Sequence, residues 1–157
     1  RLSSALGVIC TASPSRVNHM QVSGSCHCGS IRFTANTDPS KVMVCHCTDC
    51  QQLTGSAFRV AVPAPITSFK LSGEPKLYAK VGESGAKRTQ AFCSECGSPI
   101  YAAALDKPSH VSLRVGTLDQ RALFLPYLQI WERSALPWVK SLSSVPSCEK
   151  QEALDPR

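Results

Sequence analysis

The sequence is short of acidic residues, of long apolar stretches and of uninterrupted helical pattern. The 157 residues include 11 Asp and Glu against 17 Lys and Arg, and the first carboxylate is Asp38. The longest apolar stretches, such as residues 5–10, are far shorter than the roughly 20 residues needed to cross a bilayer. The 11 prolines and nine glycines are so widely spread that no long amphipathic helix fits. These shortages argue against a helical membrane protein and against a fold built on long helices.

The sequence also lacks clustered charge. Its net charge is +6, but Lys87 and Arg88 form the only adjacent basic pair, and no run of five or six like charges occurs. A nucleic-acid footprint needs basic residues gathered on one face, so we expect no nucleic-acid partner and no membrane partner. A diffuse positive charge is compatible with attracting a small anionic substrate.

The two ends of the chain differ in composition from its middle. Residues 1–20 contain Ser, Ala and Arg and no acid, a composition that resembles a transit peptide. The residues after Lys140 are polar and typical of a frayed tail. We therefore expect a leader or extension over 1–20, one domain over 21–140 and a tail over 141–157. Cys10 and Cys148 lie in these flanking segments, and we expect no role for them in a site.

Between the ends, short β-rich runs alternate with turn residues. Each run is about five residues long, which is typical of antiparallel strands. Helix is scarce, with single turns expected at 48–53 and 118–123. The sequence thus predicts a mainly β fold of antiparallel sheets with little helix. The expected strands cover residues 31–35, 42–45, 58–62, 68–71, 77–81, 89–92, 100–104, 111–115 and 127–131, with the run at 58–62 closed by Pro63 and Pro65.

Cysteine is abundant, with nine residues. A disulfide framework is disfavoured because the count is odd and because the two residues of a Cys-x-Cys pair point the wrong way for an unstrained bridge. Clusters with Cys-x-x-Cys spacing are typical of zinc sites. Thiolate ligands require a reducing compartment, which indicates the cytoplasm, or the mitochondrion if residues 1–20 act as a targeting peptide. The seven clustered cysteines are Cys26, Cys28, Cys45, Cys47, Cys50, Cys93 and Cys96.

Seven ligands divide naturally into four for a structural zinc and three for a catalytic zinc. Cys93 and Cys96, followed by Gly97, have the form of a zinc knuckle. Spacing alone does not say which clusters share an ion. The central trio, Cys45, Cys47 and Cys50, fits either an open site or a second structural site completed by His46 or His27.

Other candidate groups are weaker. His27 and His46 sit between ligand cysteines and are expected to point away from the metal that their neighbours bind. His110 is expected at the surface. Asp49 is either a proton acceptor beside the metal loop or an exposed carboxylate, which is the commoner case.

The order of these motifs resembles that of the glutathione-dependent formaldehyde-activating enzyme family, also called the centromere protein V/formaldehyde-activating domain family. Many members carry a histidine in the late strand where this chain has Gln129. The matching motifs are residues 24–29 (GSCHCG), 45–51 (CHCTDCQ) with Gly55 and Phe58, 92–98 (FCSECGS), 116–119 (GTLD) and 137–138 (PW).

The resemblance implies a β-tent fold of two antiparallel sheets pinned by zinc. It implies that Cys26, Cys28, Cys93 and Cys96 hold a structural zinc. It also implies that Cys45, Cys47 and Cys50 hold a second, catalytic zinc, which gives two ions per chain.

The activity implied is that of a carbon–sulfur lyase, which joins glutathione or a similar thiol to formaldehyde or another small electrophile. Two alternatives stay open: a non-catalytic zinc-stabilised binding module, and a hydrolase of imines or related electrophiles on the same zinc. An open zinc with three thiolate ligands favours the enzyme, because a purely structural site has four.

Overall fold

A computed structural model of the chain describes residues 19–82 and 84–151. The expected leader, apart from its last two residues, and Cys10 within it lie outside the described residues. None of the helices in the described part of the chain has the length and apolar character that a membrane crossing requires.

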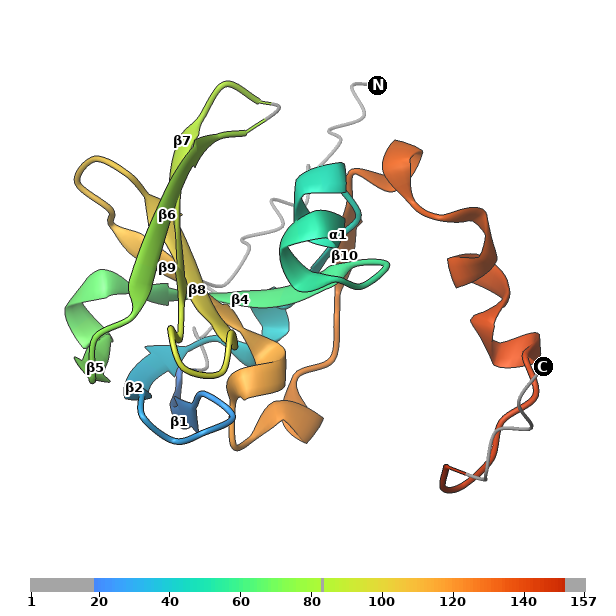
Figure 1. Cartoon of the computed structure of the whole chain (residues 1–157), viewed down its shortest axis with the longest axis horizontal. Coiled ribbons are helices and arrows are strands. Elements are labelled where there is room, and N and C mark those ends of the chain that lie inside the picture. Colours follow the sequence, from blue (N-terminus) through green and yellow to red (C-terminus); the bar gives the residue numbers. More distant parts are fainter. Residues whose placement is uncertain (1–18, 83, 152–157) are drawn as a thin grey trace, which may run out of the picture.

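Two β-sheets make up the body of the molecule (Figure 1). The smaller sheet has the strand order β1-β2-β5, and the larger has the order β10-β3-β4-β9-β8-β7-β6. The strands are β1 (Met20–Ser25), β2 (Arg32–Thr37), β3 (Met43–Cys45), β4 (Arg59–Pro65), β5 (Lys70–Ser72), β6 (Lys76–Val81), β7 (Lys87–Phe92), β8 (Pro99–Ala104), β9 (His110–Arg114) and β10 (Leu128–Ile130).

The predicted mainly β fold of two sheets is confirmed, and each expected strand overlaps an observed one. Two features differ from the prediction. Strand β1 was not expected, because its alternating Gln21, Ser23 and Ser25 give it a polar sequence. Strand β10 pairs with β3 in parallel, which makes it the exception to the antiparallel pairing of the named strands.

Strand β4 runs through Pro63 and Pro65 instead of ending before them. Beyond Ala61, β4 has left the end of β3 and pairs on one side with β9. The Pro63 carbonyl faces away from β9 and accepts a hydrogen bond from Thr37 Oγ1 at 2.6 Å. A proline on that side removes no ladder hydrogen bond, because no strand pairs with that edge of β4 beyond Ala61.

The hydrophobic core lies between the two sheets. On the large sheet, alternate residues of β4 and β9 are buried, among them Val62 and Leu113 at 0% exposure. They meet Val22 and Phe33 of the small sheet in one cluster. Because strand side chains alternate between faces, the neighbouring positions of β4 and β9 point to the opposite face of the large sheet. That second face carries the candidate site.

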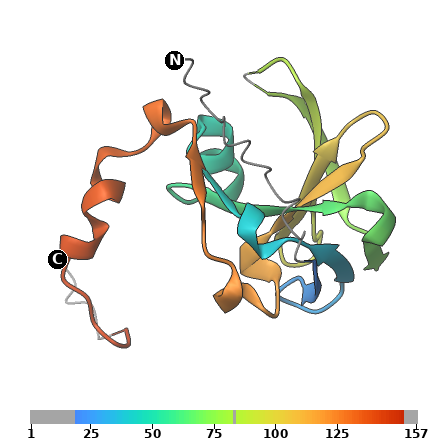
Figure 2. The same cartoon turned by 180° about the vertical axis from the view of Figure 1, so that it is seen from behind.

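Helix is scarce, as predicted. The turn expected at 48–53 is the helix α1 (Thr48–Thr54), which ends at Gly55 in the left-handed conformation, φ 59°. The turn expected at 118–123 is a shorter 3-10 helix, Arg121–Leu123. The other 3-10 helices are Pro39–Lys41, Ile66–Ser68, Val115–Thr117, Glu132–Ser134 and Pro137–Ser144, and the last of these runs away from the sheets in both views (Figure 2).

Candidate functional site

The seven clustered cysteines gather into two groups. Within each group, the sulfur atoms lie within 4.8 Å of one another. We call Cys26, Cys28, Cys93 and Cys96 the inter-sheet cluster, and Cys45, Cys47 and Cys50 the loop cluster. All seven thiols are free of disulfide bonds.

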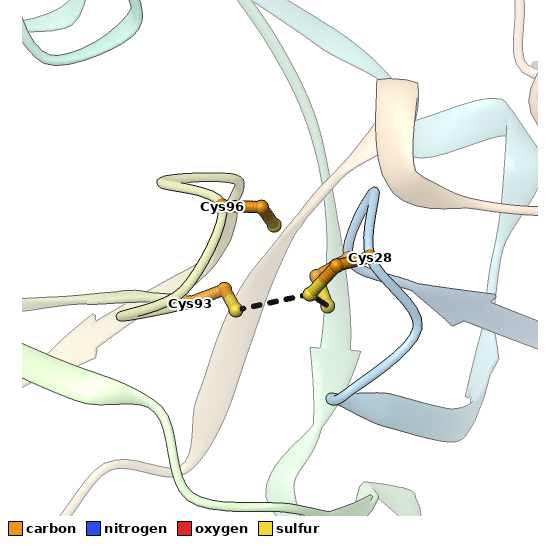
Figure 3. Close-up of side chains that lie close together, drawn as sticks. Cys28, Cys93 and Cys96 are labelled. Carbon is orange, nitrogen blue, oxygen red and sulfur yellow. Dashed lines mark hydrogen bonds between the residues drawn. The ribbon is translucent and has the colours of Figure 1, made fainter.

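The inter-sheet cluster joins two turns that are far apart in the sequence (Figure 3). Cys26 and Cys28 lie in the turn between β1 and β2, in the small sheet, and Cys93 and Cys96 lie in the turn between β7 and β8, in the large sheet. The sulfur of Cys28 is 3.4 Å from that of Cys26 and 3.7 Å from that of Cys93. Four thiolates around zinc at about 2.3 Å have sulfurs about 3.8 Å apart, so the spacing fits a tetrahedral site.

Each turn has the backbone form of a metal knuckle. Gly97 has φ 72°, and its N–H donates to the Cys93 carbonyl at 2.9 Å, which turns the chain back between the two sulfurs. The Ile31 N–H donates to the Cys26 sulfur at 3.2 Å. Hydrogen bonds from the Ser98 hydroxyl and backbone N–H lower the pKa of the Cys96 thiol to about 5. Hydrogen bonds of this kind stabilise sulfur in the thiolate form that binds metal.

The loop cluster comes from one short segment. Cys45 ends β3, Cys47 is the N-cap of α1, and Cys50 lies in the first turn of that helix. Cys47 acts as a serine or aspartate cap would, because its sulfur accepts the Cys50 N–H at 3.4 Å. The sulfurs of Cys45 and Cys47 are 3.5 Å apart. The sequence thus brings three thiols together without help from a distant strand.

The loop-cluster thiols compete for protons. A hydrogen bond from the Cys50 thiol lowers the pKa of Cys45, and the same contact raises the pKa of Cys50 far above its ordinary value. Burial raises the pKa of Cys47. Three adjacent thiols therefore do not ionise together unaided, whereas a bound cation favours all three thiolates. The donor set fits a thiophilic metal ion such as zinc.

Among residues 19–82 and 84–151, no histidine nitrogen or carboxylate oxygen joins either cluster. The buried ring of His46 lies 5.7 Å from Phe58 in an edge contact, and its Nε2 is 2.8 Å from Gln129 Oε1. His27 and His110 are exposed. The loop cluster therefore has three protein donors in the described part of the chain, and the alternative with His46 or His27 as a fourth ligand finds no support.

The loop cluster opens into a pocket of about 300 Å³. Cross-strand pairs run along one face of the large sheet and form the pocket floor, since directly opposite residues share a face. Ala61, Ala102 and Ser112 are small and leave the space. The pairs are Ile130 with Cys45, Cys45 with Arg59, Ala61 with Arg114, Ala102 with Ser112, Gln90 with Ala102, and Lys80 with Arg88.

Two arginines are buried in this floor. Arg59 is 6% exposed and Arg114 is 5% exposed. Arg59 Nη1 donates to Gln90 Oε1 at 3.2 Å, and Arg114 Nη2 donates to the same oxygen at 2.8 Å. The two nitrogens are thus about 6 Å apart at most, where two unit charges repel by about 3 kcal/mol at an effective dielectric constant of about 20. Burial, and next the charge of Arg59, lower the pKa of Arg114 to about 9.

The pocket wall is closed by an ion pair between Lys80 of β6 and Asp49 of α1. This contact joins the β6–β7 hairpin, at one edge of the large sheet, to the helix of the loop cluster, which follows β3 near the opposite edge. Asp49 is therefore a structural partner of Lys80. A wider hollow of about 670 Å³ beside Trp138 and Leu142 carries no titratable side chain, so the pocket at the loop cluster is the candidate site.

Sequence reasoning found the cysteines but missed the cations of this pocket. Arg59, Arg88 and Arg114 are separated by up to 55 positions and belong to strands whose pairing the sequence does not reveal. The one available sign was an arginine within or beside an otherwise apolar strand, as in residues 111–115. Cys148 is exposed, and its thiol is free.

Comparisons with known proteins agree with this architecture. The family model described as glutathione-dependent formaldehyde-activating enzyme matches residues 21–134, most of the chain. A crystal structure of a Rhodobacter sphaeroides protein aligns with a TM-score of 0.53 at 18% identity, covering 68% of this chain and 98% of that one. That likeness shows the fold. Among curated proteins the sequence search finds no match.

Proposed function

This chain belongs to the glutathione-dependent formaldehyde-activating enzyme family, and from that premise we propose that it is a zinc-dependent carbon–sulfur lyase. Its substrates are glutathione, or a similar thiol, and formaldehyde or another small electrophile. The observation that carries the proposal is the loop cluster: three mutually adjacent thiols, with no fourth donor among the described residues, at the wall of a pocket of about 300 Å³.

The two clusters have different tasks in this proposal. The inter-sheet cluster holds a structural zinc with four thiolates, and Cys45, Cys47 and Cys50 hold a second zinc with three. When bound there, the second ion supplies Lewis acidity and a place at which an incoming thiol is held deprotonated.

The reaction itself is an addition. The sulfur of the thiol forms a bond to the carbonyl carbon, the carbon–oxygen π bond opens, and the thiol proton ends on the new hydroxyl oxygen. Negative charge moves from sulfur to oxygen during this step. Arg59, Arg88 and Arg114 line the same pocket, and their combined positive field favours negative charge on either atom.

The pocket also favours the lyase over the binding module. A module stabilised by zinc needs a docking surface, but it has no use for two arginines buried beside an open cluster of thiols. A hydrolase on the same site would need water as a second substrate, and its products would differ. Because the ligands must stay reduced, we propose that the protein works in a reducing compartment, the cytoplasm or, if residues 1–20 act as a targeting peptide, the mitochondrion.

Exchange NMR tests the activity. Formaldehyde and its glutathione adduct interconvert spontaneously, and the zinc-loaded protein should accelerate that exchange in proportion to its concentration. The Cys148→Ser variant is the matched control, because that thiol is exposed and outside both clusters, and it should be as active as the wild type. An exchange rate equal to the spontaneous one in the presence of the zinc-loaded protein would refute the formaldehyde activity.

A further inference from the structure

The buried arginines of the pocket floor lack the partners that buried charges normally have. Each guanidinium has five N–H donors, and Arg59 and Arg114 each use one on the neutral oxygen of Gln90. Their Nε atoms are buried without any hydrogen-bond partner. Neither arginine has an ion-pair partner among the residues that the structure describes.

A bound metal does not supply the missing negative charge. Zinc with three thiolates carries a net charge of about −1. Lys80 is neutralised by Asp49, so Arg59, Arg88 and Arg114 remain as the uncompensated cations among the described residues of the pocket wall. Counted over the described residues, the metal-loaded pocket thus keeps a surplus of about two positive charges.

Such an arrangement is poor for stability alone. Buried charges are normally paired, because removing them from water is costly. Two guanidiniums pointed at one neutral acceptor repel each other and leave donors free. The same arrangement is well suited to an anion, since guanidinium groups bind carboxylates through parallel N–H donors.

We propose that Arg59 and Arg114, aligned by Gln90, form a subsite that binds a carboxylate of the molecule held at the loop cluster. This inference rests on the proposed function in one respect: it takes the loop cluster as the place where that molecule reacts. It makes the substrate an anionic compound, with its reacting sulfur or carbon at the cysteines and its carboxylate at the arginines. Gln90 acts as a positioning residue.

The carboxylate has two chemical sources. Glutathione carries one at each end, so the subsite would orient the thiol. An aldehyde or ketone that bears its own carboxylate would instead place the acceptor carbon. Both sources present the same group to the arginines, and the test separates them.

Calorimetric binding to the zinc-loaded full chain provides that test, because it needs no turnover. One probe is S-methylglutathione, which keeps both carboxylates and cannot form a thiolate. Its dimethyl ester lacks both charges, and pyruvate represents a carboxylate beside a carbonyl. The wild type should bind S-methylglutathione or pyruvate at least tenfold more tightly than the ester. Comparing acid with ester requires no variant.

The variants Arg59→Gln and Arg114→Gln should each weaken binding of the acid at least tenfold while leaving zinc content and ester binding unchanged. Arg32→Gln, an exposed arginine of β2 in the other sheet, is the matched control and should bind as the wild type does. A loss confined to S-methylglutathione assigns the carboxylate to the thiol, and a loss confined to pyruvate assigns it to the electrophile.

Two results would overturn the subsite: neither acid binding more tightly than the ester, or the arginine variants binding the acids like the control. Either result leaves the exchange activity untouched. Conversely, absence of exchange activity with carboxylate binding intact would remove the proposed reaction and keep the subsite.

Discussion

The two cysteine clusters use the same ligand atom in opposite ways. The inter-sheet cluster draws its sulfurs from turns in different sheets, and two of them, Cys26 and Cys93, are 2% and 1% exposed. The loop cluster draws all three from one segment of six residues, and all three are half-buried beside a pocket.

The tasks that we propose for the two clusters therefore differ in chain topology rather than in ligand chemistry. Cys28 and Cys93 are 65 positions apart, so a metal between them restricts a long loop of the unfolded chain. In the chain-entropy view a single link across such a loop is worth about 4 kcal/mol. A metal on the loop cluster closes only a loop of about six residues and so restricts the unfolded chain very little. Its binding energy is available for orienting a ligand.

The largest expected effect comes from the inter-sheet cluster. Cys96→Ser removes one of four ligands, and zinc-finger peptides draw about 10–16 kcal/mol from such a site. Because a whole domain is stable by only about 5–15 kcal/mol, the variant should be largely unfolded at 25 °C by circular dichroism. Cys148→Ser should keep the wild-type spectrum. A folded Cys96→Ser protein would break the comparison.

The second-largest effect is expected at the loop cluster, where a substitution should reduce activity but leave the protein folded. Cys47→Ser should lower the protein-dependent exchange rate about 100-fold or more, because it removes a thiolate ligand of the loop cluster. The serine hydroxyl can still accept the Cys50 N–H and cap α1. Its free energy of unfolding should fall by no more than about 1 kcal/mol, because serine is itself a favoured N-cap residue. Exchange NMR and urea unfolding measure the two quantities. A variant that unfolds as Cys96→Ser does would make the clusters equivalent.

The third effect tests whether the buried arginines of the pocket lower the stability of the ligand-free protein. Arg114→Met should raise the free energy of unfolding of the ligand-free protein by about 1–2 kcal/mol at pH 7, because it removes a buried charge that Arg59 repels. The folded-state pKa of Arg114 is lowered to about 9. The unfavourable contribution is therefore complete below pH 9 and fades as the pH rises through it.

Urea unfolding at pH 7 and pH 10 measures this effect. The gap between Arg114→Met and the wild type should narrow at the higher pH. Lys70→Met, on exposed β5, is the control and should show no such gap. A destabilised Arg114→Met protein at pH 7 would mean that the arginine serves the fold.

The smallest effect is expected at the ion pair between Lys80 and Asp49, which joins the hairpin to the loop-cluster helix. A double-mutant cycle with Lys80→Met and Asp49→Asn should give a coupling energy of about 0.5–1 kcal/mol. The exposed pair of Lys140 and Glu132 is the comparison and should show no measurable coupling. Equal coupling energies in the two pairs would mean that the ion pair in the pocket wall contributes no more than an exposed surface pair.

The sequence predicted the positions of the strands better than it predicted which strands pair with each other. Short apolar runs between turn residues were sufficient to place β2 to β10 approximately, because each run is local. Strand β1 was not predicted, because polar residues alternate along it and its position depends on pairing with β2. The predicted strand end before Pro63 was wrong for a related reason. A proline ends a strand only where its missing N–H would have formed a hydrogen bond with a neighbouring strand.

In the candidate site, too, the features that are local in the sequence were predictable, and those that depend on strand pairing were not. The loop cluster is readable because Cys45, Cys47 and Cys50 are neighbours in the chain. The inter-sheet cluster needed the family resemblance, since spacing does not say that the turn after β1 meets the turn after β7. The arginine pair needed the structure: Arg59 and Arg114 become neighbours because β4 pairs with β9, and Gln90 reaches them across the small side chain of Ala102.

X-ray absorption at the zinc edge of folded Cys47→Ser protein tests most directly the claim that the clusters are unequal. The account predicts one zinc per chain, surrounded by four sulfur atoms, because the inter-sheet cluster is intact and the loop cluster has lost its ion. Two zinc ions per chain, or a single zinc with fewer than four sulfur ligands, would contradict it.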